Sequence, residues 1–144
     1  MGLTARTVEY FYIRLEDSAE KAYDLLAKMA SAEVNLLAFS AVPFGPNHFE
    51  MTIFPDRSET FLALAKAMRW VAAGPQHALL VQGDDHLGAL ADIQQMLLDA
   101  DVEIYASTGV TDGSGRFGYL IYFKEADYDR AARALGAVRL PGRT

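Results

Sequence analysis

The stretch "GDDHLGALADI", Gly83 to Ile93, passes from a strand pattern into a helix pattern within a few residues. An apolar run ends at Gly83, a polar loop follows, and Gly88 stands in the first turn of the next helical pattern. A helix N-terminus carries unpaired backbone N–H groups and a partial positive charge, and a glycine there lets a ligand approach the main chain. The stretch therefore predicts a strand–loop–helix junction that can hold a carboxylate.

The same pattern occurs earlier in the chain, at the offset that places Asp17 on Asp85. With this offset apolar residues align with apolar residues without gaps: Ile13 with Val81, Leu25 with Ile93, Met29 with Leu97, Val34 with Val102 and Ile53 with Ile121. The aligned residues are widely spaced and mostly apolar. They indicate a shared core pattern.

Each half reads as strand, helix, strand, strand, helix, strand. The first half has predicted strands at 8–15, 34–42, 48–54 and, more weakly, 69–73, with helices around 22–29 and 58–68; the second has strands at 77–83, 102–108, 116–123 and 137–140, with helices at 87–98 and 126–135. This order predicts an α+β fold of two ferredoxin-like βαββαβ units, residues 1–74 and 75–144. Because units of about 70 residues are near the lower limit for a core of their own, the two are expected to lean on each other.

Composition restricts the function. The chain has 144 residues, is 51% hydrophobic and carries a formal net charge of −6 without a Lys/Arg block, which argues against nucleic acid or anionic lipid as a partner. It has no cysteine, no apolar run of about 18 residues and no signal-peptide pattern, so we expect a cytoplasmic protein without a membrane span. No nucleophile stands with a base in a known motif, and the histidines are too scattered for a metal site. We therefore expect no catalytic residue, metal or cofactor.

The two halves differ at the junction. Glu20 stands where the second half has Gly88, and with Asp17 as N-cap it can form a capping box that satisfies the helix end internally. We therefore expect the helix N-terminus of the second half to be accessible to a ligand, and that of the first half to be capped by its own side chains.

A βαββαβ unit with D-x-x-G-x-L between its first strand and first helix, here Asp85, Gly88 and Leu90, followed by "ADVEIYAST", resembles an ACT domain. The whole chain resembles a stand-alone tandem ACT protein. The proline that often precedes the glycine of this family is Leu87 here, and the first half matches neither residue. The resemblance implies two units side by side, with their sheets joined into about eight antiparallel strands and the helices on one face.

The resemblance also implies one amino-acid site at the interface between the two units. The ligand carboxylate would bind the main-chain N–H groups of Leu87, Gly88 and Ala89, while Asp85 and Asn35 would take the ammonium group or side chain. His86, Leu90 and Leu37 complete the expected ligand-binding set. The mirror-related position combines Glu20 with Glu103, two carboxylates poorly suited to a carboxylate ligand.

The implied function is that of a non-catalytic amino-acid sensor. It would act by allosteric regulation through association, as a homodimer or with a metabolic enzyme or transporter. Two alternatives stay open: a ligand-free regulatory interaction subunit, which occlusion of the loop by Leu87 or His86 would favour, and an enzyme on a ferredoxin-like fold. The residues also fit plainer roles, with Gly88 easing helix packing, Asp85 as an ordinary N-cap and Asn35 as a turn residue.

Overall fold

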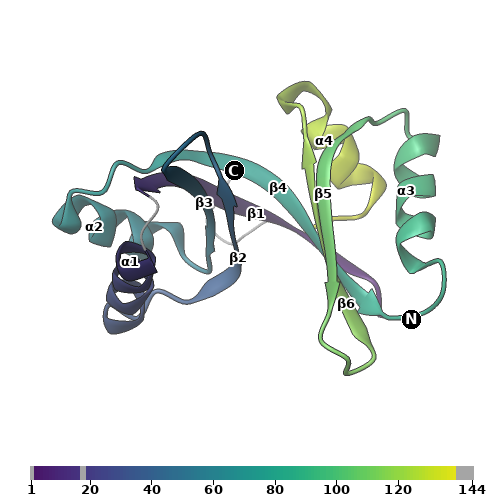
Figure 1. Ribbon diagram of the computed structural model, residues 1–144. Helices are drawn as coiled ribbons and strands as arrows, with labels where there is room; N and C mark the ends of the chain where they lie inside the picture. The colour runs from purple at the N-terminus through teal and green to yellow at the C-terminus, as the bar shows by residue number, and fades with distance from the viewer. Residues whose placement is uncertain (1, 17–18, 139–144) are drawn as a thin grey trace. The chain divides into compact units, whose positions relative to one another are not determined.

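A computed structural model describes residues 2–16 and 19–138 (Figure 1). These residues form an α+β fold of six strands and four helices. The strands are β1 (Thr4–Glu16), β2 (Leu36–Pro43), β3 (His48–Pro55), β4 (Ala73–Asp84), β5 (Ile104–Thr111) and β6 (Arg116–Phe123), and the helices are α1 (Ala19–Ser31), α2 (Ser58–Met68), α3 (Ala89–Asp99) and α4 (Glu125–Ala134).

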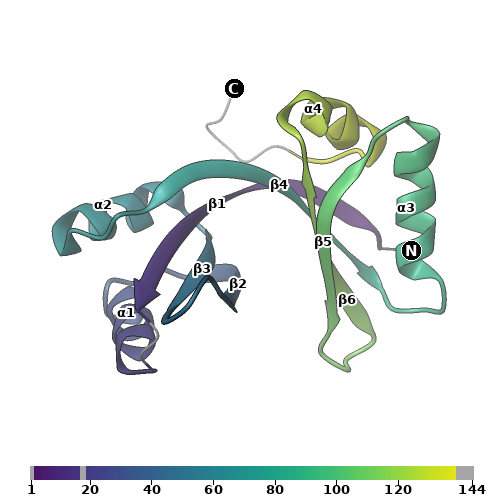
Figure 2. The same cartoon turned by 45° about the horizontal axis from the view of Figure 1, so that its top comes forward.

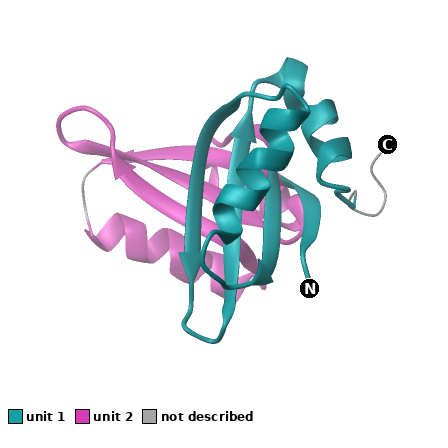
Figure 3. Ribbon diagram, turned by 90° about the vertical axis from the view of Figure 1, so that its right-hand side faces the viewer, with its two compact units in different colours: residues 1–8, 77–144 teal, residues 9–76 magenta. Residues whose placement is uncertain are grey.

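The chain divides into two compact units, coloured separately in Figure 3. Unit 1 comprises residues 1–8 and 77–144, and unit 2 comprises residues 9–76. The strand order is β2-β3-β1-β4-β6-β5. The long strands β1 and β4 each contribute residues to both units, so the described residues form six strands where the sequence predicts about eight.

In unit 2, β3 pairs antiparallel with both β1 and β2, with Phe11 and Phe39 opposite Ile53. Helices α1 and α2 cover one face of these strands, because their apolar stripes enter a common core (Figure 2). This core contains Phe11, Ile13, Leu25, Met29, Val34, Met51, Ile53, Phe61 and Ala65.

Unit 1 repeats this register at the offset that aligns Ile53 with Ile121. Strand β6 pairs antiparallel with β4 and β5, with Leu79 and Ser107 opposite Ile121, and β5 carries its irregularity at Ile104 as β2 does at Leu36. The core packs α3 and α4 against these strands through Leu79, Val81, Ile93, Leu97, Val102, Phe117, Tyr119, Ile121, Ala131 and Leu135, among others. The aligned apolar pairs of the sequence thus occupy equivalent buried positions in the two units.

The weak strand predicted at 69–73 is wrong as a separate element. Arg69 ends α2 in the left-handed conformation (φ 61°), and the N–H of Trp70 donates to the carbonyl of Ala65 at 2.9 Å. The Trp70 ring lies 6.5 Å from that of Phe61, so this residue closes the helix instead of opening a strand. Strand β4 begins only at Ala73 and continues without a break to Asp84.

The first strand begins earlier than its sequence indicates. The N–H of Thr7 donates to the carbonyl of Val138 at 3.0 Å, the N–H of Val138 donates to that of Ala5 at 2.9 Å, and Arg6 forms a parallel bridge with Val138. These bonds from the other end of the chain explain why the polar segment at 4–7 is extended. Of the predicted strand at 137–140, Val138 makes this bridge, and residues 139 and 140 lie outside the described residues.

Candidate functional site

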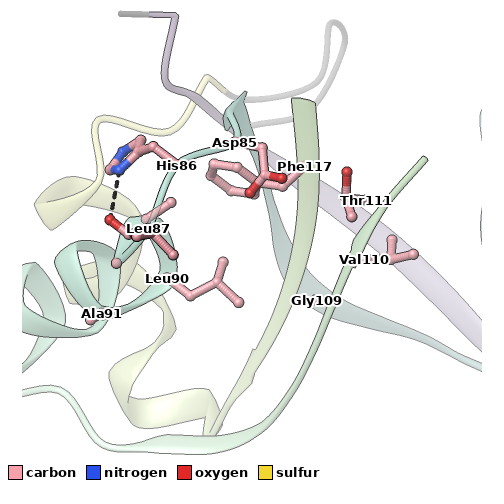
Figure 4. Close-up of a pocket in the computed structure, with 11 residues that line it drawn as sticks. Asp85, His86, Leu87, Leu90, Ala91, Gly109, Val110, Thr111 and Phe117 are labelled. Atoms are coloured by element: carbon pink, nitrogen blue, oxygen red, sulfur yellow. Dashed lines mark hydrogen bonds between the residues drawn. The ribbon is translucent and has the colours of Figure 1, made fainter. Parts of the chain in front are cut away.

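A pocket of about 350 Å³ opens at the N-terminus of α3 in unit 1 (Figure 4). This volume is within the range of small-molecule sites. The loop between β4 and α3 and the first residues of α3 form one wall, and the end of β5 with Phe117 of β6 forms the other. The lining residues are Asp85, His86, Leu87, Gly88, Ala89, Leu90, Ala91, Gly109, Val110, Thr111 and Phe117. Six of the eight residues that the sequence predicts for the site line this pocket.

Gly88 is the N-cap of α3 and has a left-handed backbone, with φ 84° and ψ 5°. A Cβ atom added here would find no atom within 4 Å apart from those of the two adjacent residues. Glycine is therefore favoured by the backbone conformation, which side chains with a Cβ adopt at a cost of about 1 kcal/mol, and not by a neighbouring group. The space in front of the helix end is open.

The helix end offers hydrogen-bond donors to this space. The N–H of Ala89 already donates to the carbonyl of His86 at 3.1 Å. Within residues 2–16 and 19–138, no partner is found for the N–H groups of Leu87, Gly88, Leu90 and Ala91, and no side chain caps the helix. These four N–H groups, with the positive end of the helix dipole, can hold an anion.

Asp85 supplies the opposite charge. Its backbone N–H donates to the carbonyl of Gly115 at 2.9 Å, which fixes the loop to the β5–β6 turn, and its side chain faces the pocket beside Phe117 (Figure 4). Neighbouring Asp84 is paired with Arg116 at 3.0 Å, so this arginine is engaged outside the lining set. The eleven lining residues include no lysine or arginine. The pocket thus combines a carboxylate with a positive helix end.

His86 and Leu87 both line the pocket. Both side chains are exposed, Leu87 completely (102%), and His86 Nδ1 donates to the carbonyl oxygen of Leu87 at 3.0 Å.

The β5 wall contains three residues that the sequence did not predict, Gly109, Val110 and Thr111. Phe117 on β6 and Ala91 on α3 were not predicted either. The signal for this wall is a glycine within a strand pattern, which often marks a close approach. A Cβ on Gly109 would lie 2.8 Å from Leu90 Cδ1, too close for two carbon atoms. Leu90 thus packs directly over the Gly109 backbone, as Figure 4 shows.

The turn that closes β5 is held by local hydrogen bonds. Thr111 Oγ1 donates to the carbonyl of Arg116 at 2.8 Å and accepts from the N–H of Gly113 at 3.2 Å. The Ser114 hydroxyl and then its backbone N–H, the latter at 2.8 Å, bond the Asp112 carboxylate and lower the pKa of this group. "DGSG", residues 112–115, is thus a hairpin turn whose polar groups satisfy one another.

The other two predicted site residues lie in unit 2. Asn35 is exposed just before β2, and its carbonyl accepts the N–H of Asp56 at 2.8 Å; Leu37 is half-buried on β2. Glu103, the counterpart of Asn35, is exposed 4.0 Å from Lys124 Nζ. Glu20 lies in the first turn of α1, and the capping partner predicted for it, Asp17, lies outside the described residues.

Neither a metal site nor a membrane-spanning helix is found in residues 2–16 and 19–138. There, no three His, Asp or Glu side chains are grouped to hold a metal ion. No helix of this part of the chain is both long and apolar enough to cross a membrane.

The fold has known relatives among solved structures. No protein-family model and no curated protein matches the sequence. Protein BT0572 from Bacteroides thetaiotaomicron has a TM-score of 0.77 at 15% identity, over 92% of this chain and 88% of that one. The ligand-free regulatory subunit of aspartate kinase from Thermus thermophilus has a TM-score of 0.63 at 15% identity, over 94% and 95%. The chain has an ACT-like fold.

A third structure agrees with this assignment. The regulatory subunit of aspartate kinase from Thermus flavus has a TM-score of 0.58 at 13% identity, over 94% of this chain and 95% of that one. At these identities the likeness concerns the ACT-like fold alone. The fold predicted from the Gly88 motif is confirmed at this level.

Proposed function

We propose that this protein is a non-catalytic regulatory sensor that binds an amino acid in the pocket at the N-terminus of α3. The observation that carries the proposal is that one pocket contains both the Asp85 carboxylate and N–H groups of the helix end that have no partner among the described residues. A free amino acid carries both charges, a carboxylate for the N–H groups and an ammonium group for Asp85. The ligand carboxylate would bind N–H groups among those of Leu87, Gly88, Leu90 and Ala91, since the N–H of Ala89 already has a partner.

The pocket residues fit a regulatory role better than a catalytic one. The pocket holds a single carboxylate and an exposed histidine whose Nδ1 is bonded to its own neighbour. The hydroxyl of Thr111 donates to the carbonyl of Arg116 and is not bonded to a base. The regulatory role of the aspartate kinase subunits points in the same direction. The protein would act on a metabolic enzyme or transporter through association, as a tandem ACT protein and as a homodimer. Such coupling requires that the amino acid bind two states of the assembly with different affinity.

A thermal-shift screen of the purified protein against the twenty standard amino acids tests the proposal. An amino acid at one hundred times its Kd adds about 2.7 kcal/mol to the stability, a rise in Tm of roughly 5–10 °C for a chain of this length. One strong stabiliser, or a small group of related ones, is expected. A flat screen would contradict the sensor and favour the ligand-free interaction subunit, whose partner would then be sought directly.

On the basis of the resemblance to ACT domains, we also propose that Asn35 contacts the ligand. The bond that Asn35 makes with Asp56 uses its backbone carbonyl and does not involve its side chain. Asn35→Ala is expected to weaken amino-acid binding about tenfold by isothermal titration, the loss of one or two hydrogen bonds, with an unchanged Tm. Glu103→Ala, the counterpart in unit 1, is the matched control and should bind normally. Equal loss in both variants would contradict the assignment of Asn35.

A further inference from the structure

A chain of hydrogen bonds crosses from α3 to β5 beside the pocket. Gln94 Nε2 on α3 donates to the Tyr119 hydroxyl on β6 at 2.8 Å, and this hydroxyl donates to Ser107 Oγ on β5 at 3.0 Å. The Tyr119 side chain is buried (2% exposed), and its oxygen both accepts and donates, so the buried hydroxyl is satisfied. Three secondary-structure elements of unit 1 are thus connected through one phenol group.

These hydrogen bonds lie next to the pocket, because they join α3 and β5, the two elements that form its walls. Gln94 follows Leu90 by one helical turn on the same face of α3, and Ser107 precedes Gly109 by two residues on the same face of β5. A turn of four helical residues rises about 6 Å and two strand residues about 6.7 Å, so the two contacts match in spacing. Helix and strand are therefore joined at two successive points, by Leu90 on Gly109 and by the hydrogen-bond chain.

In unit 2, the three positions that correspond to these hydrogen-bonding residues carry apolar side chains. In the alignment of the two halves, Gln94, Tyr119 and Ser107 correspond to Leu26, Met51 and Phe39. Met51 is fully buried in the core of unit 2, and Leu26 packs against that core. Apolar packing is therefore sufficient to hold the helix on the sheet, and a partly buried polar network is not needed for stability alone. The polar version occurs in the unit with the open helix end.

Strand β5 needs such a connection. It ends the strand order of the sheet and, in the described part of the chain, pairs only with β6. Seven of its eight residues are exposed, so little apolar packing fixes it. We propose that Gln94, Tyr119 and Ser107 are positioning residues that hold β5 at the distance from α3 that the pocket requires. This inference rests on the proposed function, because the held residues, Gly109 to Thr111, form the far wall of the pocket.

Tyr119→Phe tests the inference, because it removes one oxygen and keeps the ring in the core. Gln94 and Ser107 are both exposed, so neither is left as a buried group without a partner. In the ligand-free protein, the backbone amides of residues 107–111 are expected to exchange with deuterium about tenfold faster by NMR, as local opening of the strand becomes easier. The affinity for the strongest binder among the twenty amino acids is expected to fall about tenfold, with a Tm change of only a few degrees. Ser107→Ala should behave in the same way.

Tyr105→Phe is the matched control, since it removes an exposed hydroxyl from the same strand and should change neither quantity. A purely structural role would lower the Tm of Tyr119→Phe and leave the exchange in β5 and the affinity at wild-type values, and this result would overturn the inference. If none of the twenty amino acids binds the wild type, the proposed function fails. The exchange rates of residues 107–111 then still show whether the hydrogen bonds through Tyr119 hold β5 in position.

Discussion

Gly88→Glu is expected to abolish amino-acid binding. The new side chain enters open space in front of α3, where a Cβ meets no atom within 4 Å apart from those of the two adjacent residues, and it brings a carboxylate to the donors that the ligand carboxylate needs. Placing two like charges together in one binding site costs several kcal/mol, so the affinity should fall by at least about 100-fold. Isothermal titration with the amino acid that stabilises the wild type most measures this loss.

The backbone conformation requires a control for this experiment. Because Gly88 has φ 84°, any residue with a Cβ is expected to lower the stability by about 1 kcal/mol. Gly88→Gln carries the same strain and nearly the same volume without the charge, and it should retain much more affinity than Gly88→Glu. Glu20→Gly makes the reverse exchange in unit 2 and should leave binding unchanged. If Glu20→Gly lost binding as Gly88→Glu does, the site would belong to unit 2.

The sequence predicted the repeated parts of the fold well. Apolar periodicity encodes which face of an element is buried, and this is why the alignment of the two halves reappears in the strand register and in both cores. What it did not predict depends on contacts between distant residues. The extension of β1 to Thr4 follows from its bonds to Val138, which lies near the other end of the chain. Trp70 lies in a β-like sequence, but α2 ends at Arg69 in the left-handed conformation and the Trp70 ring lies 6.5 Å from that of Phe61.

The candidate site divides in the same way. The loop from Asp85 to Leu90 is contiguous in sequence, and its glycine and capping pattern are local signals, so these residues could be predicted and do line one pocket. The opposite wall on β5 comes from a different part of the chain, and only the glycine within that strand hinted at it. The link through Tyr119 was missed because a tyrosine in a strand pattern reads as core, and its hydroxyl partners come from two other elements.

Gly109→Val is the second variant with a large expected effect. Its Cβ would lie 2.8 Å from Leu90 Cδ1, and the two further methyl groups increase the overlap. The Leu90 side chain must move, and because it lines the pocket, its displacement narrows the space for the ligand. We expect about 1–3 kcal/mol of destabilisation from overpacking, measured by denaturant unfolding, and a loss of affinity on the order of 100-fold.

Leu90→Ala provides the compensating change, because it removes as many carbon atoms from the helix as Gly109→Val adds to the strand. The double variant conserves the volume between α3 and β5, so it should regain most of the stability and part of the affinity lost by Gly109→Val alone. A double-mutant cycle should give a coupling of about 0.5–3 kcal/mol, as expected for residues in direct contact. Additive effects would mean that Leu90 does not pack on Gly109, and the pocket would then need a different wall.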